Sequence, residues 1–279
     1  MKVTKMQGLG NDYIYINCLE ETVPDPAALA RKISDRHFGV GSDGLVLILP
    51  CEEADFRMRM FNADGSEAEM CGNASRCVAR YIHDRGLSSK EEIRLMTGAG
   101  LIILKLSVKN GKTQSVRVDM GEPVLDASKI PVIQPESRVI DAPISASGQV
   151  FRMTCVSMGN PHAVIFVEDA DRFDVHGIGA QIEVHEAFPR KTNVEFVTVK
   201  DREHLRMRVW ERGSGETLAC GTGACATLVA AVLNGLSERK AILELNGGPL
   251  TVEWDPATNH VYQEGPAEFV FDCEYPADC

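Results

Sequence analysis

Two cysteines, each followed by a glycine, are the residues of this chain best suited to chemistry. Cys71-Gly72 recurs as Cys220-Gly221 after 149 residues, and Gly10-Asn11 recurs as Gly159-Asn160 at the same spacing. Because each copy of this repeat carries one thiol, the sequence predicts a cleft with a thiol on either side. One thiolate would remove a proton from a carbon, and the facing thiol would deliver a proton to the opposite side. That chemistry inverts the configuration of the carbon.

Both cysteines stand just before a predicted helix, at about residues 74–85 and 223–234. A helix N-terminus offers unpaired N–H groups and a partial positive charge, which lower a thiol pKa and attract carboxylates. The dipole contributes only about 0.3–1 kcal/mol, and one pKa unit corresponds to about 1.36 kcal/mol. Another group must therefore assist, or the thiol stays mostly protonated. A lone cysteine is usually a small buried hydrophobe, as we expect of Cys77 and Cys225, but the repeat favours a functional role for the Cys-Gly pairs.

Further polar side chains could act beside the thiols. His162 could tune a cysteine or hold a substrate group, although a single histidine is as often structural. Arg212 could grip a carboxylate in bidentate fashion and Glu211 could take an ammonium group, although such a dipeptide is usually a surface ion pair. Five asparagines offer donors and acceptors that together suit a zwitterionic amino acid: Asn11, Asn62, Asn73, Asn160 and Asn193.

The elements that must position these residues are mostly strands, with one long helix in each half. A further helix over residues 25–36 begins with Asp25 as N-cap and Pro26 at its first position. Asn110-Gly111 and Asn246-Gly247-Gly248 mark hairpins. Alternating or continuous apolar patterns predict strands at residues 2–6, 12–17, 44–49, 57–61, 101–109, 114–120, 163–167 and 205–210. This order favours an α+β class with antiparallel or mixed sheets over repeated βαβ units.

The length of 279 residues allows one large domain or two of modest size, and the repeat favours two. We expect an N-terminal half over residues 1–120, which carries Cys71, and a C-terminal half over residues 150–264, which carries Cys220. Residues 121–149 contain prolines and little periodicity, so they are predicted to connect the halves.

Composition argues against several partners and compartments. The net charge of −11 repels phosphate backbones, so nucleic acid is not expected as a partner. No apolar run approaches the roughly 18 residues needed to span a bilayer, and no apolar signal segment opens the chain. We therefore expect a cytoplasmic protein that does not bind membranes. Nine scattered cysteines fit a reducing compartment better than a disulfide framework, and their spacing does not match that of a zinc site, so no metal is predicted.

Several motifs, at their observed separations, resemble those of the diaminopimelate epimerase family over nearly the whole chain. They are Gly8-Leu9-Gly10-Asn11-Asp12, Phe61-Asn62-Ala63-Asp64-Gly65-Ser66, Met70-Cys71-Gly72-Asn73, Ser157-Met158-Gly159-Asn160-Pro161-His162, Glu211-Arg212-Gly213-Ser214-Gly215-Glu216-Thr217 and Ala219-Cys220-Gly221-Thr222-Gly223-Ala224. The resemblance implies two pseudo-symmetric halves, each a barrel-like sheet around a central helix. It also implies an isomerase that interconverts L,L- and meso-diaminopimelate without a cofactor, a step before lysine and a peptidoglycan precursor. Family members are usually homodimers, and a C-terminal strand, here at about residues 265–279, often returns to the first half.

The resemblance also assigns roles to residues. By similarity, Cys71 and Cys220 are the acid/base pair, while His162 and Glu211 adjust the cysteines. The residues implied to contact the substrate or to cradle its carboxylate are Asn11, Asn62, Gly72, Asn73, Asn160, Asn193, Glu211, Arg212, Gly221 and Thr222. One position departs from the family pattern, because many members have glutamine where this chain has Gly44. No side-chain role is therefore assigned there, and one copy of the repeat lacks the amide that Asn193 supplies in the other.

Three other functions stay open on the sequence alone. A proline or hydroxyproline racemase would use the same architecture, but Arg212 and the asparagines favour a substrate with a second amino-acid end. A redox or sensor protein would cycle Cys71 and Cys220 between dithiol and disulfide, and such a switch would not need Asn11 or Asn160. A binding protein would hold an amino acid without turning it over.

Overall fold

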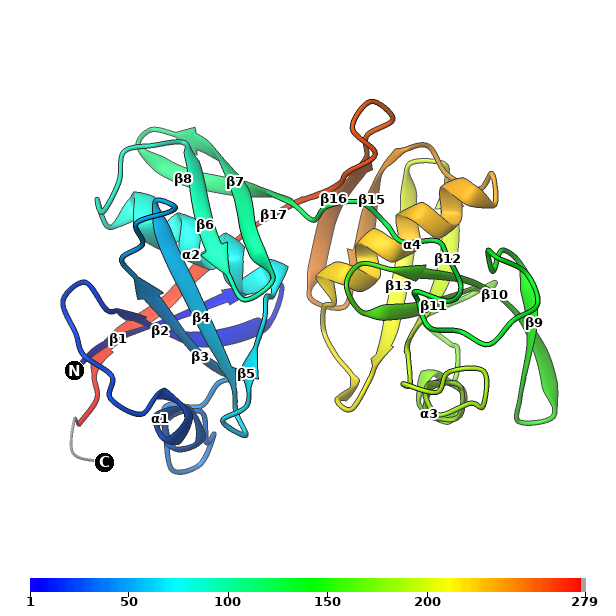
Figure 1. Ribbon diagram of the computed structural model, residues 1–279, viewed down its shortest axis with the longest axis horizontal. Helices are drawn as coiled ribbons and strands as arrows, with labels where there is room; N and C mark the ends of the chain where they lie inside the picture. The colour runs from blue at the N-terminus through cyan, green and yellow to red at the C-terminus, as the bar shows by residue number, and fades with distance from the viewer. Residues whose placement is uncertain (277–279) are drawn as a thin grey trace. The chain divides into compact units, whose positions relative to one another are not determined.

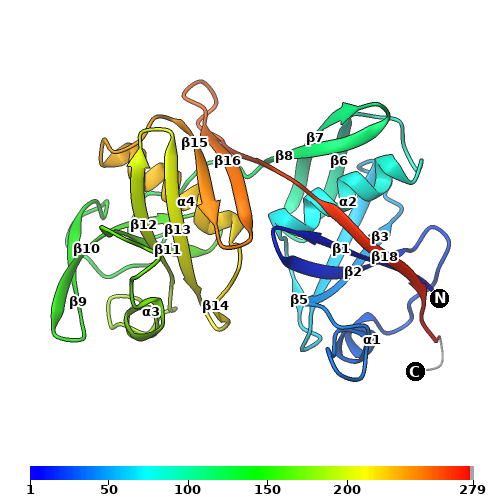
Figure 2. The ribbon, with the colours of Figure 1, turned by 180° about the vertical axis from the view of Figure 1, so that it is seen from behind.

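The computed structural model describes residues 1–276 and divides into two compact units. Unit 1 comprises Met1–Asp119 and the C-terminal segment that begins at Glu264, whereas unit 2 comprises Met120–Gln263. In each unit a mixed sheet curves around one long helix, as Figure 1 and Figure 2 show. The predicted α+β class, with two repeated halves and mixed sheets, is confirmed.

Unit 1 holds helices α1 (Pro26–Ile33) and α2 (Gly72–Asp84). Its strands are β1 (Lys2–Gly8), β2 (Asn11–Asn17), β3 (Gly44–Leu49), β4 (Phe56–Asn62), β5 (Glu67–Ala68), β6 (Glu92–Thr97), β7 (Gly100–Lys109), β8 (Lys112–Asp119) and β18 (Glu268–Glu274). The C-terminal strand β18 pairs antiparallel with β1, with Val3 opposite Cys273. The start and the C-terminal part of the described chain therefore lie in one sheet.

Unit 2 holds helices α3 (Val175–Glu183) and α4 (Gly221–Leu233). Its strands are β9 (Ala142–Ala146), β10 (Gln149–Ser157), β11 (Pro161–Phe166), β12 (Asn193–Asp201), β13 (His204–Glu211), β14 (Gly215–Glu216), β15 (Lys240–Leu245) and β16 (Gly248–Trp254), and β17 (Val261–Gly265) runs through the unit boundary. Within the described residues, no helix is both long and apolar enough to cross a membrane.

The repeat seen in the sequence is also a repeat of strand pairing. In unit 1, β2 runs parallel to β3, β3 antiparallel to β4, and β4 parallel to β6; β11, β12, β13 and β15 follow the same pattern in unit 2. The register matches too, because Tyr13 lies opposite Gly44 while His162 lies opposite Asn193. Residues 149 positions apart therefore occupy equivalent places in the two units.

The two long helices are buried for different reasons. The sequence of α4 contains no charged residue, and a helix that is apolar on all sides is stable only when it is enclosed. By contrast, α2 buries Arg76 completely, and this guanidinium donates to Asn73 Oδ1 at 2.7 Å and to Pro266 O at 3.1 Å. Arg80 likewise donates to Ala267 O. The segment before β18 therefore holds α2 in place.

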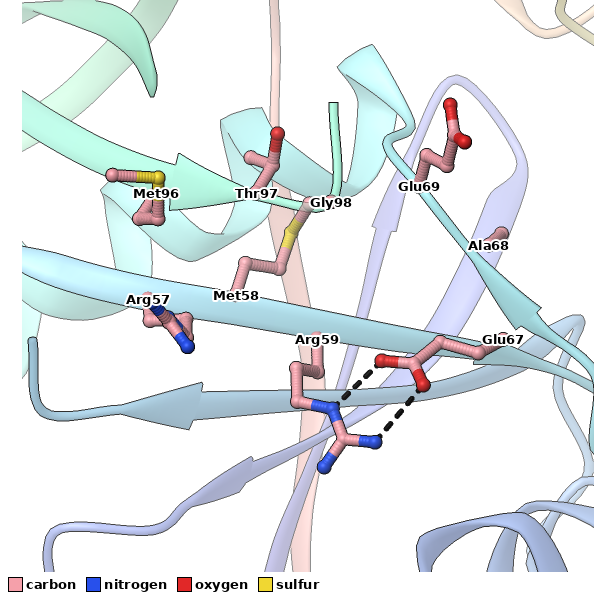
Figure 3. Close-up of a pocket in the computed structure, with 9 residues that line it drawn as sticks. All are labelled: Arg57, Met58, Arg59, Glu67, Ala68, Glu69, Met96, Thr97 and Gly98. Atoms are coloured by element: carbon pink, nitrogen blue, oxygen red, sulfur yellow. Dashed lines mark hydrogen bonds and ion pairs between the residues drawn. The ribbon is translucent and has the colours of Figure 1, made fainter. Parts of the chain in front are cut away.

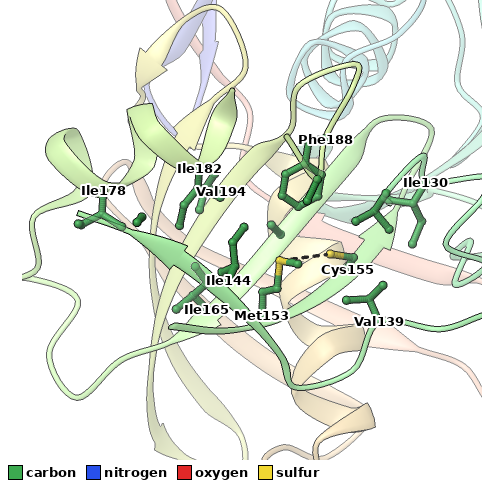
Figure 4. Packing of buried hydrophobic residues seen from close by; sticks show 14 of the residues in the cluster. Ile130, Val139, Ile144, Met153, Cys155, Ile165, Ile178, Ile182, Phe188 and Val194 are labelled. Carbon is green, nitrogen blue, oxygen red and sulfur yellow. Dashed lines mark hydrogen bonds between the residues drawn. The ribbon is translucent and has the colours of Figure 1, made fainter. Parts of the chain in front are cut away.

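Each unit also has a core between its short helix and its strands. In unit 2, Ile178 and Ile182 of α3 pack in one cluster with Ile165 and Val194 (Figure 4). Residues 121–149 were predicted to connect the halves but instead belong to unit 2. They contribute β9 and buried apolar side chains to this cluster, which the irregular spacing of those residues concealed: Ala127, Ile130, Val132, Val139, Ile144 and Ala146.

The short helices and a hairpin follow the local rules used to predict them. Asp25 caps α1 by accepting from Ala28 N at 2.9 Å, although the helix ends at Ile33 and not at residue 36. Asp174 caps α3 in the same way. At the predicted β7–β8 turn, Asn110 and Gly111 have φ values of 53° and 71°, the left-handed pair that a two-residue hairpin requires.

Candidate active site

Cys71 is the N-cap of α2, and its side chain is half-buried. Its backbone is extended (φ −141°, ψ 124°), and the side chain does not cap the helix. The thiol donates to Asn11 Oδ1 at 3.4 Å, and Asn73 Nδ2 approaches the same oxygen at 3.5 Å. The start of β2 and the first turn of α2 thus bring three of the predicted site residues together.

Acidic and basic groups that the sequence analysis did not single out hold Asn11. Asn11 Nδ2 donates to Asp43 Oδ2 at 2.7 Å. Arg36 donates to Asp43 at 2.9 Å and to Asp12 at 2.8 Å. The amide of Asn11 is therefore oriented with its oxygen toward Cys71.

Asn62, the other predicted contact in unit 1, lies at the end of β4. Its side chain donates to Ser66 Oγ at 2.9 Å across the turn to β5. The structure therefore groups Asn62 with this turn and not with the hydrogen bonds around Cys71.

Cys220 is the N-cap of α4, in the position equivalent to Cys71, and it is buried. Unlike Cys71, it caps its helix, because Gly223 N donates to Cys220 Sγ at 3.3 Å. Thr222 Oγ1 lies 3.4 Å from the same sulfur. A Cβ at Gly221 would lie 2.8 Å from Gln263 Oε1, so a larger residue there would displace the end of the Gln263 side chain.

The charges near Cys220 oppose its ionisation. Burial raises the pKa of the Cys220 thiol well above its usual range, and the Glu211 and Glu195 carboxylates raise this pKa further. Hydrogen bonds from Thr222 and Gly223 act in the opposite direction. Burial also raises the pKa of Glu211, although a hydrogen bond from Thr217 works against that rise. The thiol is therefore the favoured form of Cys220 in the free protein.

His162 is fully buried and joins two other polar side chains. Its Nδ1 lies 2.7 Å from Glu195 Oε1, and its Nε2 lies 2.9 Å from Asn160 Oδ1. Asn160 Nδ2 in turn donates to Thr222 Oγ1 at 3.3 Å. The structure thus links predicted residues His162, Asn160 and Thr222 to Cys220, and it adds Glu195, which the sequence analysis missed.

Asn193 and Arg212 meet through the backbone. Asn193 Oδ1 accepts from Arg212 N at 2.9 Å, and its Nδ2 donates to Pro161 O at 2.8 Å. The Arg212 guanidinium extends to the exposed carbonyl of Arg190 at 3.2 Å. No intramolecular carboxylate in the described chain pairs with this guanidinium, which is therefore available to an anionic ligand.

A matching arginine–glutamate pair precedes each cysteine. Arg59 binds Glu67 in bidentate fashion at 2.7 and 2.9 Å, and Arg208 binds Glu216 at 2.7 and 3.0 Å. Each glutamate stands four residues before the cysteine of its unit. In unit 1 the pair borders a cavity of about 370 Å³ that also includes Glu69 (Figure 3). These pairs fix the short strands β5 and β14, from which the chain enters the two helices.

Sequence comparison assigns the chain to a family. The model of the family described as diaminopimelate epimerase matches residues 3–125 and 154–270. Diaminopimelate epimerase of Acetivibrio thermocellus is 60% identical over 274 residues, covering 98% of both chains, and that of Methanococcus maripaludis strain S2 is 55% identical, covering 98% of this chain and 99% of its own. The chain belongs to the diaminopimelate epimerase family. As a member, it is an epimerase and therefore an isomerase.

Solved structures at lower identity share the fold of this diaminopimelate epimerase family member. A PhzF-family phenazine biosynthesis protein of Bacillus anthracis aligns with a TM-score of 0.70 at 17% identity, covering 99% of both chains. A hydroxyproline epimerase of Agrobacterium vitis, with bound trans-4-hydroxy-L-proline, aligns with a TM-score of 0.68 at 17% identity, covering 98% of this chain and 90% of its own. At these identities the likeness concerns the fold alone.

The structure leaves no room for a side chain at Gly44, the position that departs from the family pattern. A Cβ at Gly44 would lie 2.0 Å from Phe61 O, so no side chain fits. The backbone of Asp43 makes the two equivalent contacts instead, because Asp43 N donates to Asp12 O at 2.7 Å and Asp43 O accepts from Ala63 N at 3.0 Å. Residues 12 and 63 are the counterparts of Pro161 and Arg212, the two partners of Asn193.

Within the described chain, no group of three or more His, Cys, Asp or Glu side chains is arranged to hold a metal ion.

Proposed function

We propose that this protein interconverts L,L- and meso-diaminopimelate without a cofactor, with Cys71 and Cys220 as its acid/base pair. The observation that supports this most is that both cysteines are N-caps of equivalent 13-residue helices. A repeat gives two thiols equivalent positions, and a reversible inversion needs two groups that can exchange the roles of acid and base. The identity to diaminopimelate epimerases over nearly the whole chain supports this substrate.

In the proposed step, one cysteine enters as a thiolate and the other as a thiol. The thiolate removes the proton of the substrate α-carbon, and the thiol protonates the opposite face of the resulting carbanion. After the reaction the roles are exchanged, which is the state required for the reverse direction. Because the thiol form of Cys220 is favoured, we expect Cys220 to be protonated in the free protein. Cys220 would then be the proton donor and Cys71 the thiolate when the substrate binds.

The substrate contacts belong to the same proposal. The N–H groups of Gly72 and Asn73, with those of Gly221 and Thr222, would bind the carboxylate beside the reacting carbon, because a helix N-terminus favours an anion. The Arg212 guanidinium would bind a second carboxylate. The other proposed contacts are Asn11, Asn62, Asn160, Asn193 and Glu211. We further propose that the protein acts in the cytoplasm as a homodimer, in the synthesis of lysine and of a peptidoglycan precursor.

Proton NMR in D₂O tests the proposal directly. The reduced protein is incubated with L,L-diaminopimelate without added cofactor, and the α-proton signal and the isomer ratio are followed. Loss of the α-proton signal together with formation of the meso isomer is expected. A folded, reduced protein that causes no exchange would refute the proposed substrate.

Two controls separate the rival functions. L-Proline and trans-4-hydroxy-L-proline are offered under the same conditions, and turnover of either would favour a proline-type racemase. Reductant is then varied: it should only preserve activity if the protein is an epimerase, whereas a redox protein would consume it stoichiometrically.

A further inference from the structure

A buried glutamate–histidine pair lies beside Cys220 and has no counterpart in unit 1. Glu195 and His162 are both 0% exposed and 2.7 Å apart. The equivalent positions of unit 1, 149 residues earlier, hold Val46 and Tyr13. Glu195 Oε2 is buried and has no hydrogen-bond partner among the described residues. Burying this oxygen without a partner costs free energy, and the cost is large if the carboxylate carries a full negative charge.

The hydrogen bonds of Asn160 indicate which nitrogen of His162 carries a proton. Asn160 Nδ2 donates to Thr222 Oγ1, so Asn160 Oδ1 faces His162 Nε2 at 2.9 Å. An amide oxygen only accepts hydrogen bonds, so Nε2 must be the protonated nitrogen. A second proton must then lie between His162 Nδ1 and Glu195 Oε1, on one atom or the other. In both forms the pair is electrically neutral, which suits the unpartnered oxygen of Glu195.

The same chain of hydrogen bonds determines which hydrogen-bond donors face Cys220 Sγ. Thr222 Oγ1 accepts the Asn160 N–H, which leaves the threonine hydrogen free to point toward Cys220 Sγ at 3.4 Å. Gly223 N donates to the same sulfur at 3.3 Å. Two donors at one sulfur stabilise a thiolate, the form that Cys220 must adopt in one direction of the proposed reaction.

We propose that Glu195 is a positioning residue for Cys220. It fixes the proton of His162 on Nε2, and through Asn160 it turns the Thr222 hydroxyl toward the sulfur. This inference rests on the proposed acid/base role of Cys220. Glu195 itself acts only through His162 and does not touch the substrate.

Other ionisable groups face this chain and must stay constant in any test. Glu211 on β13 is the second carboxylate beside Cys220, and it accepts from Thr217. On β10, burial and then Glu195 raise the pKa of Cys155, which keeps that thiol neutral. The variants below leave both groups in place.

The first test measures the tautomer of His162 in the wild-type protein. The protein is labelled with ¹⁵N-histidine, and the His162 signals are identified by their absence in a His162→Gln variant. A protonated Nε2 is expected. A neutral ring with its proton on Nδ1 and an unprotonated Nε2 would overturn the proposal, because Asn160 would then present its N–H group to His162 and its oxygen to Thr222.

The second test compares Glu195→Gln with Glu195→Leu, both of which remove the carboxylate. Only glutamine can donate to His162 Nδ1 and keep Nε2 protonated, since its oxygen then replaces the unpartnered Oε2. Iodoacetamide labelling of Cys220 is followed against pH by peptide mass spectrometry. The pH midpoint should be lower in Glu195→Gln than in Glu195→Leu by about one unit, the size expected for a retained hydrogen bond to a charged sulfur. Equal midpoints would overturn the proposal.

A matched control and an internal reference accompany this comparison. Glu183 is another buried glutamate of unit 2, but it binds Trp210, Gly213 and Lys191. The Glu183→Gln variant should leave the Cys220 midpoint unchanged, and a shift of about one unit there would also overturn the proposal. The Cys71 midpoint should be the same in every variant. If Glu195→Leu does not fold, the His162 tautomer measured in the wild-type protein is the test of the proposal.

Neither readout depends on turnover. If L,L-diaminopimelate is not epimerised but the tautomer and the labelling midpoints are as expected, the proposed function fails, while the effect of Glu195 on His162 and on the Cys220 sulfur stands. If epimerisation is found and His162 Nε2 is unprotonated, the proposed function stands and the positioning role of Glu195 fails.

Discussion

Cys71 and Cys220 begin equivalent helices, yet their surroundings differ in burial, charge and hydrogen bonding. Cys71 is half-buried and donates to one amide oxygen. Cys220 is buried, receives a backbone N–H and lies beside two carboxylates. The repeat therefore preserves the backbone position of each sulfur, while the neighbouring side chains have diverged. Equivalent placement in the chain does not give the two sulfurs the same surroundings.

The contrast between Gly44 and Asn193 shows that a shared contact can use different atoms. In unit 2 an asparagine side chain bridges two backbone groups, and in unit 1 the backbone of Asp43 makes both bonds. What the two units share is the pair of hydrogen bonds and not the residue that forms them.

The largest expected effect is on the epimerisation rate, because both cysteines have the same proposed role in proton transfer. Cys71→Ala and Cys220→Ala should each lower the epimerisation rate by about 10³-fold or more, because each removes one of two essential proton-transfer groups. NMR assays of both isomers in D₂O measure this, with circular dichroism to verify folding. Near-normal turnover in either folded variant would exclude a mechanism that uses both thiols.

The arginine–glutamate pairs should differ in their effect on stability. The Arg208 and Glu216 side chains are 16% and 13% exposed, whereas those of Arg59 and Glu67 are 42% and 46% exposed. Arg208→Gln should therefore lower the free energy of unfolding by about 1–3 kcal/mol, since the mostly buried Glu216 carboxylate loses its bidentate partner and keeps His176 and Asn246. Arg59→Gln should cost about 0.2–1 kcal/mol. Urea unfolding of both variants compares them, and equal losses would contradict this interpretation.

Removal of the Glu211 charge should make the two cysteines more alike. A carboxylate next to Cys220 raises the pKa of the thiol, so its loss favours the thiolate. In Glu211→Gln, the pH midpoint of Cys220 alkylation should fall by about one unit. The Cys71 midpoint in the same protein serves as the control. An unchanged or higher Cys220 midpoint would show that Glu211 does not oppose its ionisation.

The smallest expected effect is one that the two units should share. Asp25 and Asp174 stand 149 residues apart and cap α1 and α3 by the same bond to a backbone N–H. Asp25→Ala and Asp174→Ala should each cost about 1 kcal/mol of unfolding free energy, as N-cap replacements usually do. Thermal and urea unfolding measure both. A much larger loss in one variant would mean that its aspartate does more than cap a helix.

The sequence predicted elements that depend on local rules. Asp25 and Pro26 predicted α1, and Asn110-Gly111 predicted a hairpin. The apolar spacing after Cys71-Gly72 predicted the first long helix, and the repeat predicted the second. Helix α3 was not predicted, although the repeat places Asp174 at the position of the N-cap Asp25. The repeat thus extends to the N-caps of the short helices as well as to the cysteines.

The parts of the site that were missed depend on tertiary structure. Glu195 alternates with Val194 and Phe196, so its strand pattern suggests an exposed side chain, yet β12 is buried there on both faces. The backbone of Asp43 makes the contacts that the Asn193 side chain makes in unit 2, and residue types do not reveal such backbone contacts. Sequence therefore identified groups with evident chemistry, and the structure was needed to find the groups that orient them.

The strand β18 has a consequence for how the protein is made. All of unit 2 is synthesised before β18, whereas unit 1 is missing its strand next to β1 until residues 268–274 have emerged from the ribosome. Since domains generally fold as units during synthesis, unit 2 can fold on the nascent chain while unit 1 is still incomplete. The hydrogen bond from Arg76 of α2 to Pro266 O also forms only after residue 266 has been synthesised. The helix that begins at Cys71 is therefore the later of the two to become fixed, although its residues are translated first.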